Sequence, residues 1–72
     1  MSEPTPYERL HADGSLWARG HMLDGEQHGY FEWYRKDGTL LRTGNFDRGR
    51  QIGEWTTFDS NGAPYKTTYF PE

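Results

Sequence analysis

The chain contains no cysteine, which excludes disulfide bonds, thiolate metal sites and cysteine nucleophiles. Its mean hydropathy is -1.10, and it lacks the run of about 20 apolar residues that a transmembrane helix needs. No signal peptide is expected, because no apolar run follows a basic N-terminus. Eight Lys and Arg against 11 Asp and Glu give a net charge of -3. Neither nucleic acid nor a membrane is therefore an expected partner, and we expect a soluble cytoplasmic domain.

Aromatic residues, in contrast, are abundant. They make up 17% of the 72 residues, within a hydrophobic share of only 32%. Disordered chains are poor in aromatics, so we expect a folded domain with an aromatic core. In a chain below roughly 70–80 residues a single core supplies only a few kcal/mol. Regular local structure or association must therefore add to it.

A repeat of 24 residues runs through the sequence. All nine glycines follow this period: Gly14, Gly38 and Gly62; Gly20 and Gly44; Gly25 and Gly49; Gly29 and Gly53. Tyr7, Phe31 and Trp55 form an aromatic column with the same spacing. Such a period is typical of stacked supersecondary units.

Short turn motifs divide each repeat into strands. The Asp-Gly or Asn-Gly pairs at 13–14, 37–38 and 61–62 indicate type I′ hairpin turns, in which both central residues need positive φ. Asp24-Gly25 and Arg48-Gly49 are interpreted as the return connections. Strands are predicted near 5–10, 15–22, 28–34, 39–46, 52–58 and 63–70. The predicted fold is all-β, an antiparallel meander of about six strands in a single twisted sheet.

The prolines define the ends of this domain. They lie at 4, 6, 64 and 71, in or beside the two outer strands, where proline discourages pairing between sheets. We expect a repeat domain over 5–70, a flexible N-terminus over 1–4 and a short C-terminal tail over 71–72.

Two-residue loops at every turn assign the side chains to two faces. One face carries Tyr7, Leu16, Met22, Phe31, Trp33, Leu40, Phe46, Trp55 and Phe70, and the other carries Leu10, Trp17, Tyr30, Tyr34, Leu41, Phe58, Tyr65 and Tyr69. One extra loop residue would invert the faces. Tyr7 is expected opposite Gly20, and Phe31 opposite Gly44. Either a ring covers each glycine backbone, or the glycines mark β-bulges.

The repeat resembles a known family. The segments from Asp13-Gly14-Ser15-Leu16 to Gly29-Tyr30-Phe31-Glu32-Trp33-Tyr34, and from Asp37-Gly38-Thr39-Leu40 to Gly53-Glu54-Trp55, resemble MORN repeats. They are most similar to the bacterial MORN variant often labelled as the antitoxin component of toxin–antitoxin systems. The resemblance covers residues 7–70, with Met22 and Phe46 where the family often has tyrosine. It implies stacked β-hairpins in a twisted sheet with an aromatic-lined face, and a role in protein interaction or dimerisation. Some eukaryotic members have been linked to phosphoinositide membranes.

The leading functional hypothesis is a non-catalytic protein-interaction module. A single sheet with aromatics on both faces cannot bury both within one small chain, and an uncovered apolar face usually marks an interaction surface. The predicted binding face comprises Tyr7, Phe31, Trp33, Phe46 and Trp55, with a partner protein or a second copy, as in a dimer, as its occupant. Alternatively, twist of the sheet hides the rings and leaves a monomer.

A second hypothesis is a metal site. With two-residue turns, His21 pairs with His28, and His28 lies opposite Asp47. Two imidazoles and a carboxylate in one row could bind a zinc-like ion with an open position. The alternative is three polar residues at the surface, where His11 is also expected.

The remaining candidates are carboxylates and arginines. Glu8 and Glu32 occupy equivalent repeat positions, but Glu8 faces Arg19 as an ordinary cross-strand pair. Neither enzyme activity nor a cofactor is therefore expected. Arg9, Arg35 and Arg42 would join the rings of the first face. They leave single-stranded nucleic-acid binding, or binding to a lipid surface, as alternatives to their role as cover for apolar side chains.

Overall fold

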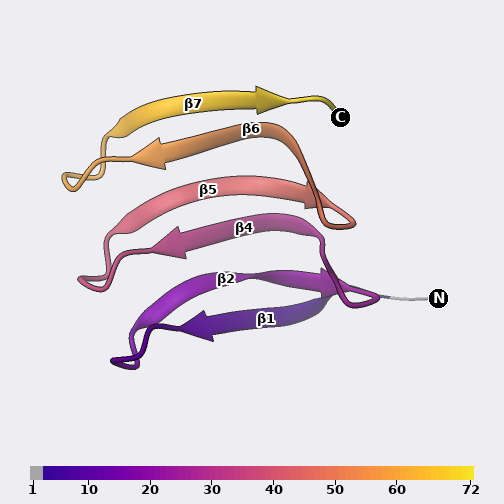
Figure 1. The fold of residues 1–72 in the computed structure, drawn as a ribbon, viewed down its shortest axis with the longest axis horizontal. Coiled ribbons are helices and arrows are strands. Elements are labelled where there is room, and N and C mark those ends of the chain that lie inside the picture. Colours follow the sequence, from indigo (N-terminus) through magenta and orange to yellow (C-terminus); the bar gives the residue numbers. More distant parts are fainter. Residues whose placement is uncertain (1–2) are drawn as a thin grey trace.

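A computed structural model describes residues 3–72 as one antiparallel β-sheet (Figure 1). The strands are β1 (Thr5–Leu10), β2 (Leu16–Leu23), β3 (Glu26–Gln27), β4 (Gly29–Tyr34), β5 (Leu40–Asp47), β6 (Arg50–Phe58) and β7 (Pro64–Phe70). They lie in the order β1-β2-β4-β5-β6-β7, and the short β3 pairs with β2. The predicted all-β meander is confirmed. Residues 1–2 of the predicted flexible N-terminus lie outside the described residues.

The two kinds of turn have exchanged their predicted roles. In Asp24-Gly25 both residues have positive φ, 52° and 83°, and in Arg48-Gly49 the values are 52° and 87°. These return connections are therefore the type I′ turns. In the pairs at 13–14, 37–38 and 61–62 only the glycine has positive φ, so the prediction of type I′ turns there is wrong.

These three turns are three-residue loops. In the first, the Gly14 amide donates to the His11 carbonyl at 2.9 Å and the His11 amide to the Ser15 carbonyl at 2.8 Å. This is the pattern of a type I turn followed by a left-handed glycine. The Asp13 carboxylate accepts hydrogen bonds from the Ser15 hydroxyl and amide, at 2.6 and 3.0 Å. These bonds lower the pKa of Asp13.

A β-bulge after each three-residue loop restores the predicted register. The extra residue of the bulge is Trp17 in the first hairpin, Leu41 in the second and Tyr65 in the third. Each loop has one residue more than predicted, and the bulge adds one more to the strand that follows it. Beyond the bulges Tyr7 therefore lies opposite Gly20, as predicted.

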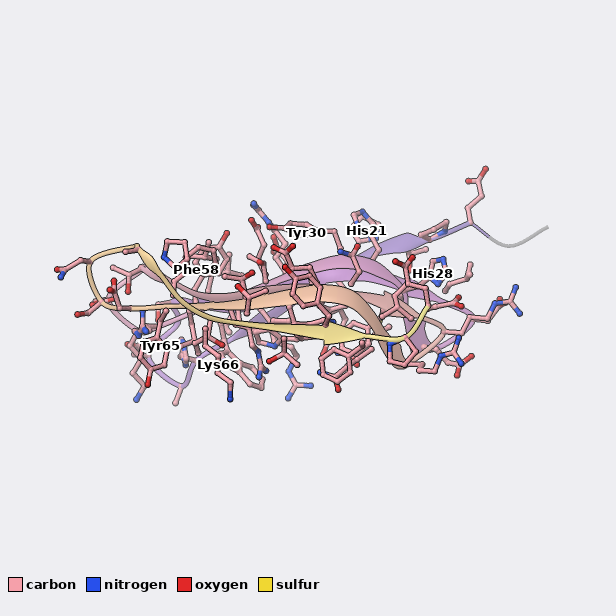
Figure 2. All side chains as sticks on the ribbon, turned by 90° about the horizontal axis from the view of Figure 1, so that it is seen from above. His21, His28, Tyr30, Phe58, Tyr65 and Lys66 are labelled. Atoms are coloured by element: carbon pink, nitrogen blue, oxygen red, sulfur yellow. The ribbon has the colours of Figure 1, made fainter. Side chains whose placement is uncertain are left out.

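The bulges do change the face of individual side chains. Leu41, predicted on the face of Tyr30, packs against the core, and Tyr65 lies on the opposite side of the sheet from Tyr30 (Figure 2). Leu40 was predicted on the core face, but it pairs with Tyr34. Directly opposed residues share a face, so the predicted faces of Leu40 and Leu41 are exchanged.

The core consists of rings on one face of a single layer. Ala18, Phe31, Trp33, Phe46 and Trp55 are buried and in contact. Ring centroids lie 5.2 Å apart for Phe31 and Phe46, 5.3 Å for Trp33 and Trp55, and 5.0 Å for Phe46 and Trp55. The molecule measures 40 × 30 × 13 Å. The rings are therefore buried mainly against one another and the sheet. We call this side of the sheet the ring face.

Gly20 and Gly44 allow rings to lie flat on the sheet. A Cβ built on Gly20 would lie 2.5 Å from the Phe31 ring, and a Cβ on Gly44 would collide with the Trp55 indole. Each covering ring comes from the strand that follows the glycine, so Tyr7, although opposite Gly20, is not the ring that covers it.

The covering strand carries a bulge of its own. In the pairing of β5 with β6, Asn45 lies opposite Ile52, and the next pair is Thr43 opposite Thr56. Residues 53–55 therefore lie opposite the single residue Gly44. Gly53 begins this bulge with a φ of 68°, and Gly29 occupies the same place before Phe31 with a φ of 83°. Ring cover and bulge, the two alternatives for the glycines, are therefore both present.

We expect Gly44→Ala to reduce the free energy of unfolding by about 1–3 kcal/mol, because the added methyl group displaces the Trp55 indole from the core. Thr68→Ala is the matched control, since Thr68 is the third residue of the same repeat column and is exposed. It should change stability by less than about 0.5 kcal/mol. Urea unfolding followed by tryptophan fluorescence measures both, and equal stabilities would contradict ring cover.

We expect Arg48→Asn to stabilise the chain by about 0.5–1 kcal/mol, because asparagine tolerates the left-handed backbone that costs other residues roughly 1–2 kcal/mol. Lys36→Asn removes one positive charge at an exposed turn residue without positive φ and serves as the control. A melting temperature for Arg48→Asn no higher than that of Lys36→Asn would show that the second turn is not strained.

Candidate interaction surface

The predicted aromatic binding face is the core of the molecule. Phe31 has no exposed surface, Trp33 is 8% exposed, Phe46 9% and Trp55 5%. Tyr7 is half-buried and packs against them. The structure therefore brings the five side chains together but removes four of them from contact with a partner. The alternative, that the rings are hidden within the sheet, describes them correctly.

The histidine and aspartate residues lie near the return turns. The His28 amide donates to the His21 carbonyl at 3.0 Å, and His28 Nδ1 lies 3.9 Å from an Asp47 carboxylate oxygen. The same Nδ1 accepts a hydrogen bond from the Arg48 amide at 3.2 Å. The predicted neighbours are thus adjacent. Within residues 3–72, however, no three His, Cys, Asp or Glu side chains are placed to hold a metal ion.

His11 and Arg35 link neighbouring turns. The Nε2 atom of His11 lies 3.0 Å from the Tyr34 carbonyl. One repeat later, Arg35 donates to the carbonyls of Phe58, at 2.5 Å, and Asp59, at 3.3 Å. His11 is half-buried by this contact with the neighbouring turn. Arg35 is committed to a turn and does not join the rings.

Arg19 binds Glu32 rather than Glu8. Arg19 is paired in register with Glu8 of β1 and Glu32 of β4, but its guanidinium donates to Glu32, at 3.1 Å. The Tyr34 and Tyr30 hydroxyls donate to the same carboxylate at 2.8 and 3.3 Å. Burial, with the Glu32 carboxylate next, raises the pKa of both tyrosines. Arg19, Tyr30 and Glu32, together with Glu8 and His21, line an open hollow of about 350 Å³.

We expect Glu32→Gln to destabilise the chain by about 1 kcal/mol, since one carboxylate holds an arginine and two hydroxyls and the exposed arginine is screened by solvent. Glu8→Gln, from the same row, should change stability by less than about 0.5 kcal/mol. Urea unfolding at neutral pH compares the two, and a larger effect of Glu8→Gln would contradict the observed pairing.

The raised tyrosine pKa values also set a dependence on alkaline pH. The stability that this shift contributes is fully present below the ordinary tyrosine pKa of about 10. It is lost as the pH rises through the raised pKa of Tyr34 in the folded state. In Glu32→Gln the Tyr34 phenol should ionise at lower pH than in the wild type, as measured by ultraviolet absorbance.

The two edges of the sheet differ. Pro6, the second residue of β1, lies opposite His21. The His21 carbonyl accepts its hydrogen bond from the His28 amide, on the side of β2 that faces away from β1. Pro6 and His21 are therefore not joined by backbone hydrogen bonds, and the backbone of Pro6 faces the open edge of the sheet. A proline at this position removes a donor from that edge. On β7, Pro64 and Pro71 leave the residues between them unblocked, so the predicted proline protection applies to the start of each outer strand and not to the rest of it.

The repeat indicates which β7 backbone groups are open. Tyr69 occupies the repeat position of His21 and Asn45. The His21 carbonyl accepts a hydrogen bond from the His28 amide. The Asn45 carbonyl accepts one from Trp55 Nε1 at 3.1 Å. Both donors come from the part of the chain that follows the return turn. Tyr69 and Thr67, two residues apart, therefore direct their N–H and C=O groups outward. The sequence-based prediction missed this edge because it counted prolines near β7 without the direction of its backbone.

Exposed aromatic side chains accompany this edge. Tyr65 and Tyr69 are each 73% exposed, and in β7 only Phe70 is even partly buried. No helix in the described part of the chain is long and apolar enough to cross a membrane.

No family model matches this chain, and it has no significant match among curated proteins or solved structures. The MORN resemblance is carried by the residue pattern alone. The function is therefore argued from the geometry of the sheet and its edges.

Proposed function

We propose that the chain is a non-catalytic protein-interaction module that self-associates by pairing its β7 edge with β7 of a second copy. The observation that carries this proposal is the edge of β7, which contains no proline from Tyr65 to Phe70 and exposes nearly all of its side chains. An open edge presents unpaired N–H and C=O groups to which another strand can pair.

The residues of β7 suit such pairing. Between Tyr65 and Phe70 the only charged residue is Lys66, and the others are threonine or aromatic, the types that favour cross-strand contacts. Antiparallel pairing of β7 with itself is two-fold symmetric. Because such pairing uses the same edge of both copies, it yields a closed dimer and not a filament.

The hairpin repeats in a single twisted sheet support the further proposal that the chain is a MORN-like repeat protein. Under this proposal, the chain acts in the cytoplasm by associating with a second copy of itself. An antitoxin role would add a toxin as a second kind of partner.

We expect the wild-type chain to have twice its mass of 8.4 kDa in solution, measured by light scattering after size exclusion across a hundredfold dilution. Thr67→Pro should yield a monomer, because it removes an outward N–H without breaking the pairing to β6. Thr67→Ala keeps that N–H and should remain a dimer. Circular dichroism checks that both variants fold. A monomeric wild type, or a dimeric Thr67→Pro, would contradict the proposal.

A further inference from the structure

The ring face carries a row of cations that runs across the whole sheet. Successive register partners in this row are Arg9, Ala18, Trp33, Arg42, Thr57 and Lys66. Figure 2 shows Lys66 on the side opposite Tyr30 and His21. The salt bridges among the described residues engage Arg19, His28 and Arg50. None of them neutralises a cation of this row.

Arg42 is held in place by stacking. Its guanidinium carbon lies 4.8 Å from the Trp33 ring centroid and 5.5 Å from that of Trp55. Stacking on indole rings orients the planar guanidinium while its N–H groups remain available for hydrogen bonds at its edge. Among residues 3–72 no acceptor binds this guanidinium, so the side chain is a preorganised donor.

Arg42 and Lys66 share an open hollow. It has a volume of about 160 Å³, and its polar lining consists of Arg42, Lys66, Thr57, Thr68 and Gln51. Every one of these side chains can donate a hydrogen bond, and no carboxylate lines the hollow. A carboxylate group, only a few times larger than the roughly 30 Å³ of a water molecule, fits this space.

We propose that this hollow is an oxyanion site that binds a carboxylate side chain of an acidic polypeptide lying across the ring face. The site goes beyond the proposed dimer, because it uses side chains that project from the face of β5, β6 and β7, whereas the dimer uses the backbone edge of β7.

Charge and spacing favour a polypeptide over a nucleic acid. Polyphosphate binding gains from the neutralisation of many phosphates, whereas this face offers three strand cations on a chain of net charge -3. Arg42 and Lys66 are two strands apart, roughly 10 Å at about 4.8 Å per strand. Carboxylates three residues apart in a polyproline II segment lie on one side of it at a similar separation, since that helix has three residues per turn and each residue advances about 3.1 Å. Arginine also pairs with a planar carboxylate through two parallel hydrogen bonds.

The test is titration of the full chain at low ionic strength with a capped peptide of sequence Glu-Ala-Ala-Glu, monitored by calorimetry. Lys66→Gln and Arg42→Gln should each weaken binding about fivefold or more. Arg9→Gln is the matched control, since it removes the same charge from the same row but lies outside the hollow. It should change affinity less than twofold. The capped peptide Gln-Ala-Ala-Gln should not bind.

Three results would overturn the proposal. Equal weakening by Arg9→Gln would show an effect of net charge alone. Unchanged affinity in Lys66→Gln, whose exposed side chain is not needed for folding, would show that the hollow is not the site. Binding of inorganic phosphate or oligothymidylate without the peptide would assign the hollow to phosphate. Thr67→Pro should bind the peptide like the wild type, so loss of the dimer and loss of this site are distinguishable.

Discussion

The fold depends on the contact between an aromatic ring and the bare backbone of a glycine in the preceding strand. Phe31 makes this contact on Gly20, and Trp55 makes it on Gly44. A single-layer sheet has no second layer to cover its side chains, so a ring can be buried only by lying on the sheet and against other rings. Close approach requires that the opposing residue lack a Cβ. It also requires the bulge that Gly53 begins, which advances the covering strand by two residues.

This arrangement determines where function can lie. Rings that fill the core are not available to a partner, so the aromatic content is largely structural. Three features of the described residues then remain accessible to a partner. They are the backbone edge of β7, the cations stacked above the rings, and the acidic hollow around Glu32 on the other face. In that hollow the carboxylate is already bound by Arg19 and two hydroxyls. The β7 edge and the cation Arg42, in contrast, have unused hydrogen-bonding capacity.

The sequence predicted the strands and their register well, because glycine spacing and aromatic columns repeat together. Its errors concern features that sequence spacing alone does not determine. An Asp-Gly pair suits both a type I′ turn and the end of a three-residue loop, and the loop's extra residue is compensated by the bulge at Trp17. The choice of Glu32 over Glu8 as the partner of Arg19, and the burial of Trp33, depend on contacts between strands. Spacing along the chain does not determine such contacts.

Thr68 of β7 distinguishes the two ways in which the open edge could be covered, by a paired strand or by another hairpin of the repeat. Within the array, each strand that precedes a return turn has a glycine on which the next ring lies. In β7 the equivalent residue is Thr68, whose side chain occupies the space that a further ring would need. A further hairpin of the same kind therefore cannot stack on β7. Backbone pairing needs no such space, since it uses only the N–H and C=O groups in the plane of the sheet. A strand such as a second β7 would satisfy that edge, whereas the β1 strand of another copy would bring Pro6 to its pairing edge.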